Sequence, residues 1–387
     1  MGKTLGMDYA PLARALAEQV RAAGTPDHIA SLFHRVPRHR FLPDVMWGED
    51  RTRYDRAADF EGWLRAAYSD EAMTTQLDDG AEGGMGLPTS SSSAPSVVAR
   101  MLTAARIEPG HKVLEVGTGT GWAAALLAEL LGSRNVATVE IDTDVALRAR
   151  TALHTAGYAP EVIIGDGENP PMRPDAVHRV IATCQVARIP WAWLDLVRPR
   201  GLVVTPWSPT PGAPGGVLAV LERLGRGLGE GAFRGSLAFM WARGQRRPAG
   251  VRPGLGAAPD RTDHVEGDPR EPWLDGETSL LLSLLVPDWR HGMGMEDGAT
   301  EPHVWIASTR CGSWARYHAD GRVEQGGRPR ALAEEFRVGL DWWRARGEPG
   351  VDRWGLTVDR STGRQTVWLD SPSAPLWSAH RPSGVSR

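Results

Sequence analysis

The chain has 387 residues, of which 41% are hydrophobic and 24% are charged, and its formal net charge is -3. This composition is that of a soluble globular protein, and the length predicts two domains rather than one. The balanced charge argues against a nucleic-acid-binding protein, which would carry a strongly basic domain.

Cysteine usage and hydropathy predict a cytoplasmic protein without a membrane span. The two cysteines, Cys184 and Cys311, lie far apart and have no CxxC partner, so neither a zinc site nor a disulfide framework is expected. The N-terminal segment lacks the apolar core of a signal peptide. No run reaches the roughly 18 apolar residues of a membrane span. We therefore expect no bound metal and no membrane partner.

The N-terminal region predicts two helices and a long loop. Apolar residues spaced by four over 9–23 indicate a helix. A second helix is expected over 25–33, with Thr25 as its N-cap and Pro26 at the first helical position. After a proline-bounded connector, residues 66–93 are rich in Gly, Ser, Thr and Asp and show no periodicity. We expect a long loop there, and loops of this length are usually functional or disordered.

Apolar strands and helices alternate in the middle of the chain. Helices are expected over 96–105, from Trp122 and over 145–156. Short buried strands are expected over 113–116, 135–142, 161–167, 178–184 and 201–207. This alternation predicts an α/β fold whose Rossmann-like sheet is mostly parallel and doubly wound.

The last third of the chain differs in composition from the middle, because ten of the 16 tryptophans fall between Trp241 and Trp377. Two further strands are expected over 217–224 and 233–241, and a Gly-, Pro- and Arg-rich linker over 243–270. Beyond it we expect a helix over 330–347 and strands over 354–359 and 366–370.

The predicted organisation has three parts. N-terminal helices and a substrate loop occupy 1–95, the core occupies 96–250, and a smaller C-terminal α+β domain occupies 251–387. Tryptophan and arginine interleave in this last part, and both are favoured at protein interfaces. Peptide recognition is therefore one interpretation of it, and an ordinary hydrophobic core is the other. The scattered histidines lack metal-ligand spacing.

Three consecutive strand ends carry residues suited to a nucleoside. The segment 115–121, EVGTGTG, follows a strand and opens a helix, and its glycines let the backbone approach a ligand closely. Glu140 ends the next strand, where a carboxylate can accept hydrogen bonds from both ribose hydroxyls, and Asp166 with Gly167 ends the third. Dinucleotide enzymes use a GxGxxG turn, whereas here the spacing is GxGxG and Trp122 stands at the last glycine position. These residues favour a nucleoside without a pyrophosphate.

Residues 36–241 resemble the protein L-isoaspartyl (D-aspartyl) O-methyltransferase family. VPRHRF (36–41) looks like the family's VPR-x-x-F segment, and SSSSAPSVVARML (90–102) looks like its T-I-S-x-P-x-x-x-A-x-M motif. Residues 107–128, the IIGDG segment and VRPRGLVVTPW are similar to its cofactor and strand motifs. The resemblance implies a class I methyltransferase fold, S-adenosyl-L-methionine as cofactor and a peptide substrate.

The resemblance also implies roles by position. Ser93 falls on the family's active-site serine, where it would orient a substrate carboxylate, and Ser92 and Ser91 are weaker candidates for the same pocket. The positions that fall on or beside the cofactor motifs are Glu115, Gly117, Thr118, Gly119, Gly121, Glu140, Ile141, Asp166, Gly167 and Thr183.

Departures from the repair enzymes of this family concern the substrate. The chain has Ser91-Ser92 where the family has Thr-Ile, an inserted DDGAEGG, and a region after about residue 250 without counterpart in those enzymes. It looks more like a branch with an extra C-terminal domain that is associated with ribosomally made, modified peptides such as lanthipeptides and ω-ester peptides. That branch esterifies an aspartyl carboxylate of a cyclised peptide, which leads to aspartimide or isoaspartate.

General isoaspartyl repair is the main alternative function. A non-catalytic cofactor-binding scaffold for a peptide cyclase and a small-molecule O-methyltransferase are two others.

Overall fold

The computed structural model describes residues 8–211, 215–246, 257–296 and 298–380. The chain folds into two compact units, each of which is built from several separate stretches of the sequence. The first unit holds the residues up to 184 together with 190–205 and 222–227, and the second holds 185–189, 206–221 and the residues from 228 onward. Within the described residues, no helix is both long and apolar enough to cross a membrane.

Short helices open the first unit. The predicted first helix is confirmed as α1 (Ala10–Ala22), which buries an apolar stripe including Leu16 and Val20. The prediction of one helix over 25–33 is wrong, because the chain forms α2 (Asp27–Ala30) and α3 (Leu32–Arg35). Thr25 is not the N-cap of α2 either, since that position is Pro26 and no side chain caps the helix. The 3-10 turn η1 (Arg38–Phe41) follows.

Two strands of a four-stranded sheet stand where the sequence predicted a long loop. Its strand order is β2-β1-β3-β4, and α4 (Phe60–Ala67) lies between its strands in sequence. The loop prediction for 66–93 is wrong because β3 (Met73–Leu77) and β4 (Pro88–Ser92) pair as an antiparallel hairpin. Most of their side chains are polar and partly exposed, which explains why no apolar period marks them. The two remaining strands are β1 (Val45–Trp47) and β2 (Arg53–Asp55).

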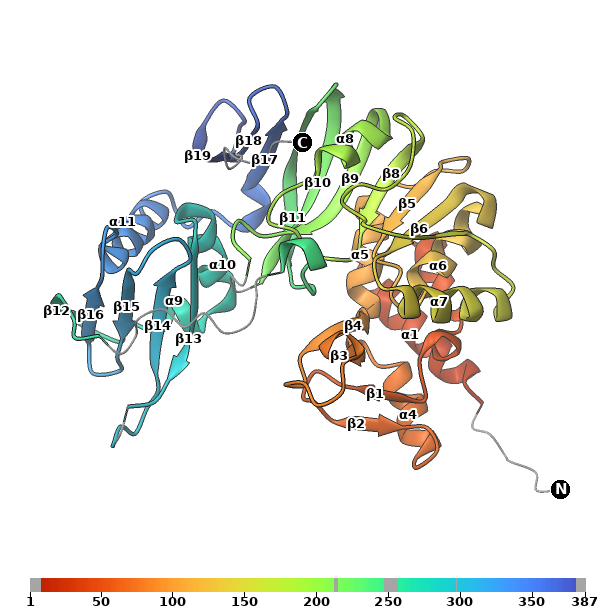
Figure 1. Cartoon of the computed structure of the whole chain (residues 1–387), viewed down its shortest axis with the longest axis horizontal. Coiled ribbons are helices and arrows are strands. Elements are labelled where there is room, and N and C mark those ends of the chain that lie inside the picture. The colour runs from red at the N-terminus through yellow and green to blue at the C-terminus, as the bar shows by residue number, and fades with distance from the viewer. Residues whose placement is uncertain (1–7, 212–214, 247–256, 297, 381–387) are drawn as a thin grey trace. The chain divides into compact units, whose positions relative to one another are not determined.

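The parallel strands of the first unit confirm the predicted doubly wound sheet. Their order is β9-β8-β5-β6-β7. The first of them in sequence, β5, lies in the middle, with β6 and β7 on one side of it and β8 and β9 on the other, which is the strand-order reversal of doubly wound sheets. The strands are β5 (Val113–Val116), β6 (Val136–Glu140), β7 (Glu161–Ile164), β8 (Val177–Ala182) and β9 (Val197–Trp207). The helices that connect them are α6 (Trp122–Leu131), α7 (Thr143–Thr155) and α8 (Trp191–Leu196), with α5 (Pro95–Ala104) before the first strand and the turn η3 (Ser133–Asn135) before the second. Figure 1 shows α6 and α7 beside β5 and β6.

Antiparallel strands follow in the order β10-β11-β17-β18-β19, and they belong to the second unit except for residues 222–225 at the end of β10. They are β10 (Gly216–Gly225), β11 (Leu228–Leu237), β17 (Trp354–Asp359), β18 (Arg364–Leu369) and β19 (Pro375–His380). β11 pairs with β17, so two strands more than 100 residues apart in sequence are neighbours. Strands from residues 251–387 take part in two sheets, this one and a separate five-stranded sheet.

The rest of the second unit is an α+β segment between β11 and β17. Its five-stranded antiparallel sheet has the order β12-β16-β15-β14-β13. Its elements are η4 (Arg243–Gln245), β12 (Arg261–His264), α9 (Glu271–Leu274), α10 (Gly276–Leu285), β13 (Trp289–Gly294), β14 (His303–Ser308), β15 (Trp314–Tyr317), β16 (Arg322–Gly326), α11 (Leu332–Arg344) and η5 (Val351–Arg353). The linker predicted over 243–270 thus includes a strand, and its residues 247–256 lie outside the described part.

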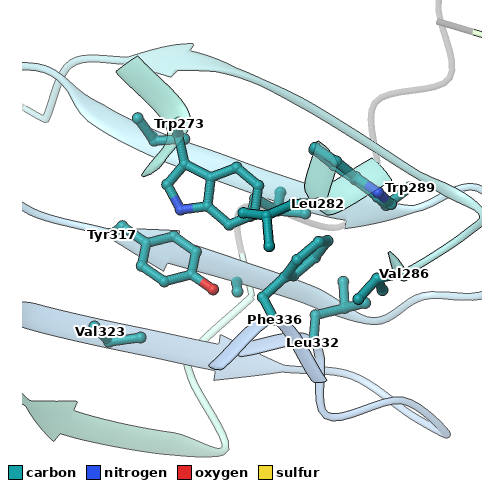
Figure 2. Close-up of a cluster of buried hydrophobic side chains, with 11 residues drawn as sticks. Trp273, Leu282, Val286, Trp289, Tyr317, Val323, Leu332 and Phe336 are labelled. Atoms are coloured by element: carbon teal, nitrogen blue, oxygen red, sulfur yellow. The ribbon is translucent and has the colours of Figure 1, made fainter. Parts of the chain in front are cut away.

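An aromatic core holds this α+β segment together. Trp273 packs edge-on against Phe336 with ring centroids 4.7 Å apart, and Trp289 contacts the same ring at 4.8 Å (Figure 2). Edge-to-face contacts of this kind add to the free energy gained by burying the rings. Most of the tryptophans in this part of the sequence are therefore core residues, as the second of the two sequence interpretations holds.

Candidate functional site

The turn between β5 and α6 depends on three glycines with positive φ. Gly117, Gly119 and Gly121 have φ values of 95°, 53° and 86°, a region that residues with a β-carbon rarely adopt. A β-carbon on Gly117 would also lie 3.0 Å from the Oγ1 atom of Thr183. The turn therefore presents bare backbone at the carboxyl end of the sheet.

Glu115 supports this turn from inside the protein. Its side chain is fully buried, and Oε2 accepts a hydrogen bond of 2.7 Å from the Thr138 hydroxyl, which in turn contacts the Thr118 hydroxyl at 2.7 Å. Burial raises the pKa of Glu115 to about 8, so the carboxyl is mostly protonated at neutral pH. Among the described residues, Oε1 has no hydrogen-bond partner.

Glu140 lies at the tip of β6, beside the glycine turn. Its carboxylate accepts hydrogen bonds from the backbone N–H of Gly119 at 2.9 Å and of Asp142 at 3.1 Å. The Asp142 side chain caps α7 by accepting from two backbone N–H groups of its first turn. The carboxylate of Glu140 is thus held at the entrance of the turn with a fixed orientation.

The third strand tip meets the other two. A β-carbon on Gly167 would lie 2.5 Å from Cγ1 of Val116, so only glycine allows the chain to pass this close to β5. The Gly167 carbonyl accepts a hydrogen bond of 2.7 Å from the Trp193 indole. Asp166 stands before it, and its Oδ1 accepts from the backbone N–H of Glu168. Next to these tips, Ile141 and Ile164 each leave 41% of their surface exposed.

Thr183 and Cys184 follow β8. The Thr183 hydroxyl donates a hydrogen bond of 2.6 Å to the Gly117 carbonyl, which ties this strand end to the glycine turn. Cys184 is a neighbour that the sequence did not single out for this site. Burial raises the pKa of its thiol to about 12, so the sulfur stays protonated and is not a reactive thiolate.

Residues 90–93, the serine segment, lie directly against residues 117–121, the glycine turn. The Ser91 carbonyl is 3.2 Å from the position that a β-carbon on Gly119 would take. A small cavity of about 160 Å³ is lined by both Ser90 and Gly119. Residues 28 positions apart in sequence therefore lie side by side.

The three serines of the prediction differ in their surroundings. Ser92 is 3% exposed, and its hydroxyl accepts a hydrogen bond of 3.2 Å from Nε of Arg38. Ser91 and Ser93 are half-buried. Among the described residues, no hydrogen bond involves the Ser93 hydroxyl, whereas the Ser93 carbonyl accepts from Arg38 at 3.0 Å. The Ser91 hydroxyl likewise forms no hydrogen bond within the described residues, so Ser91 and Ser93 both keep a half-buried hydroxyl that is free to bind another group.

Two contacts that no sequence pattern marks hold this segment. Arg38 belongs to the VPRHRF motif, but nothing in the sequence shows that its guanidinium is buried. Gln76 of β3 donates a hydrogen bond of 3.2 Å to the Asp142 carboxylate and accepts one of 3.0 Å from the Thr89 hydroxyl. These bonds tie the β3–β4 hairpin to the start of α7, next to Glu140.

The profile of the family described as protein-L-isoaspartate(D-aspartate) O-methyltransferase matches residues 12–213, which is more than half of the chain. The chain belongs to this family. All the site residues described above fall within the matched range. Residues 214–387 lie outside it.

Known members of the isoaspartate O-methyltransferase family show how far the likeness extends. Protein-L-isoaspartate O-methyltransferase 2 of Archaeoglobus fulgidus is 32% identical over 203 residues, which cover 52% of this chain and 80% of that protein. Its namesake from Rhodopseudomonas palustris is 40% identical over 121 residues, 31% of this chain and 55% of that protein. The chain thus spans little more than half the length of this second relative.

A solved structure of a protein-L-isoaspartate O-methyltransferase aligns with a TM-score of 0.53 at 18% sequence identity. The alignment covers 93% of this chain and 100% of the other. This likeness concerns the fold alone, and it confirms the predicted class I methyltransferase fold.

A cluster of ionisable side chains lies outside the range that the family profile matches. Glu296, His303 and His318 place possible ligand atoms within 4.8 Å of one another, although their spacing in sequence gave no sign of it. Nη2 of Arg322 donates to both Glu296 and His318, at 3.0 and 3.1 Å. A guanidinium thus already supplies the positive charge among these groups.

Proposed function

We propose that this chain binds S-adenosyl-L-methionine at the tips of β5, β6 and β7 and transfers its methyl group to a carboxylate oxygen of an isoaspartyl or aspartyl residue in a peptide. The observation that carries this proposal is the contact between the Ser91 carbonyl and Gly119. It brings the serine segment and the glycine turn, the two parts needed for substrate and cofactor, to the same place.

The residues at the strand tips fit such a cofactor. The positive-φ glycines expose backbone, and Glu140 offers acceptors for the two ribose hydroxyls. Asp166 is placed to meet the polar edge of an adenine, and the exposed Ile141 and Ile164 offer apolar surface for its ring. Trp122 is buried directly after the turn, where a dinucleotide-binding turn of the GxGxxG type carries glycine.

The chemistry needs little from the protein beyond positioning. S-adenosyl-L-methionine, when bound, supplies an electrophilic methyl group on a positively charged sulfur. A peptide carboxylate has a pKa of about 3.9 and is ionised at neutral pH, so it is a nucleophile without a general base. Ser93 would donate a hydrogen bond to one carboxylate oxygen while the other attacks. Orientation of this kind can lower a barrier by up to roughly 7–11 kcal/mol in favourable cases.

The product explains why such a reaction matters for aspartyl groups. Methyl esterification turns the carboxylate into an ester with a better leaving group. The backbone amide nitrogen that follows can then attack the ester carbonyl, lose its proton and release methanol, which gives a five-membered succinimide. Water can open this ring to aspartate or isoaspartate.

Two substrate classes follow from different parts of the chain. The family match over 12–213 favours an isoaspartyl residue, as in repair of damaged proteins. A modified ribosomal peptide is the second candidate, suggested by the sequence resemblance, and the chain has room for a further recognition element because a five-stranded sheet with its own aromatic core lies outside the matched range. In this second case the α+β segment would recognise the peptide.

A methyl-transfer assay with labelled cofactor separates these possibilities. The substrates are an isoaspartyl hexapeptide, the same hexapeptide with ordinary aspartate, and a cyclised ribosomal peptide that contains aspartate. Turnover of the first alone supports repair, and turnover of the third alone supports peptide tailoring. If no carboxyl methylation occurs while calorimetry shows cofactor binding, the chain is a binding scaffold and the proposed function is wrong.

A further inference from the structure

Arg38 is a buried cation at the edge of the candidate site. It begins η1, its side chain is fully buried, and its guanidinium carbon lies 5.1 Å from the centroid of the Trp122 ring. Burial lowers the pKa of Arg38 to about 10, which leaves the group charged at neutral pH. A buried guanidinium is costly unless its N–H groups are satisfied, so its partners indicate what it does.

Within the described residues, the hydrogen-bond partners of Arg38 are uncharged, and they come from two segments. On one side are the carbonyls of Ala67, Ser69 and Glu71, at 3.4, 3.0 and 2.9 Å. On the other side are the serines. Nε donates to the Ser92 hydroxyl at 3.2 Å, and Nη2 donates to the carbonyls of Ser92 and Ser93 at 3.1 and 3.0 Å.

We infer that Arg38 is a positioning residue for methyl transfer, because its guanidinium fixes the backbone of Ser92 and Ser93 and thereby the direction of the Ser93 hydroxyl. The inference rests on the role proposed for Ser93. Arg38 itself does not touch the reacting atoms. It binds the serine segment on one side and the segment after α4 on the other, so that the position of Ser93 does not depend on its own loop alone.

Arginine suits this task and lysine does not. The guanidinium presents five N–H groups in a rigid plane, and Arg38 uses that plane to reach both segments at once. A lysine ammonium has three donors on one nitrogen and cannot reach acceptors on both sides at these distances. Arg38→Lys therefore keeps the charge and removes the bridge.

The chain offers a matched control in Arg179. This arginine is 9% exposed, and within the described residues it donates to backbone carbonyls alone, those of Ala105, Arg106 and His178. It stands near the start of β8, opposite Val113 at the start of β5, whereas the candidate site lies at the other end of these strands. Arg179→Lys thus removes a comparable bridge without touching the site.

The experiment compares Arg38→Lys and Arg179→Lys in the full-length chain by two readouts. In hydrogen exchange, Arg38→Lys is expected to speed exchange in peptides that cover 88–96 about tenfold or more while those covering 113–121 stay unchanged. In turnover, kcat should fall about 10- to 100-fold, since small misplacements have effects of this size. KM for S-adenosyl-L-methionine and the dissociation constant of S-adenosylhomocysteine should stay within threefold. Arg179→Lys should keep kcat within threefold.

Unchanged exchange over 88–96 in Arg38→Lys would overturn the inference, and so would an equal loss of kcat in both variants. If Arg38→Lys does not fold, Ser92→Ala replaces it, because the Ser92 hydroxyl is buried and accepts from Nε of Arg38. It should speed exchange over 88–96 and lower kcat about threefold, and no change in either would count equally against the inference. A wild-type protein that methylates no peptide refutes the proposed function, while the exchange readout still decides on Arg38.

Discussion

The Ser91 carbonyl oxygen lies 3.2 Å from the place that a β-carbon on Gly119 would take. This relationship joins the β3–β4 hairpin to the turn after β5. A β-carbon at Gly119 would force the carbonyl to shift by a few tenths of an ångström, so the close packing of the two segments favours glycine there.

Gly119→Ala should therefore damage the site more than it damages stability. The new methyl group meets the Ser91 carbonyl, and we expect the dissociation constant of S-adenosylhomocysteine to rise about tenfold, which corresponds to roughly 1.4 kcal/mol. The control is Gly110→Ala, where φ is also positive, at 83°, but nothing lies within 4 Å of the added carbon. Both variants should lose about 1 kcal/mol of unfolding free energy from backbone strain. Equal affinities for both variants by calorimetry would show that the contact does not matter.

Ser93→Ala should keep cofactor binding and lose most methyl transfer. A hydrogen bond to a charged group contributes about 1.5–3 kcal/mol, so kcat should fall roughly 10- to 100-fold. Ser96→Ala is the matched control, because Ser96 is also half-buried and lies in the first turn of the adjoining helix α5. It should stay within twofold of the wild type. A Ser93→Ala variant that turns over substrate like the wild type would remove Ser93 from the mechanism.

Glu140→Gln should weaken cofactor binding without unfolding the protein. The amide keeps one oxygen that can accept from Gly119 but loses the second acceptor and the charge, so we expect affinity for S-adenosylhomocysteine to drop about tenfold or more. Glu161→Gln, at the exposed start of β7, changes the same charge at the other end of the sheet and should leave affinity unaltered. Isothermal calorimetry on both variants gives the comparison. Parallel losses would point to an effect of net charge.

Stability should fall with rising pH because of Glu115. Its folded pKa of about 8 lies above its ordinary value of 4.5, so the protonated carboxyl stabilises the fold fully below about pH 4.5, and this contribution is lost as pH rises through about 8. Glu115→Gln stays neutral at both pH values. The unfolding free energy of the wild type should therefore fall, relative to that of the variant, by roughly 3–5 kcal/mol between pH 5 and pH 9. Urea denaturation at both pH values tests this, with Glu18→Gln on the exposed side of α1 as control. A wild type and a Gln variant with parallel pH profiles would contradict it.

The parallel part of the fold could be predicted because its signals are local. Each strand from β5 to β8, and the second half of β9, contains a short and mostly apolar run, and the GxGxG turn has its own spacing. The same locality made Glu140, Asp166 and Gly167 recognisable, since each follows directly on such a strand. The structure brings these three tips together, and it places the serine segment beside them.

The remaining features depend on contacts between distant residues. β3 and β4 carry Thr, Gln and Ser, so their pairing leaves no apolar pattern in the sequence. Arg38 looks like a surface arginine until the carbonyls of 67–71 and 92–93 surround it. β12, with the sequence RTDH, is polar throughout, and only its pairing with β16 makes it a strand.

The pairing of β11 with β17 decides how this gene product can be shortened. In this register Ala232 lies opposite Gly355. The long segment between the two strands therefore begins and ends at the same place in the sheet. A stop codon near residue 250 would remove β17, the neighbour of β11, and leave β11 as an unpaired edge strand. Unpaired edge strands of this kind promote aggregation. Deleting the segment between β11 and β17 and joining the two strands by a tight turn would keep all strand pairings of that sheet. Comparing this shortened chain with the full chain would show what the deleted segment contributes.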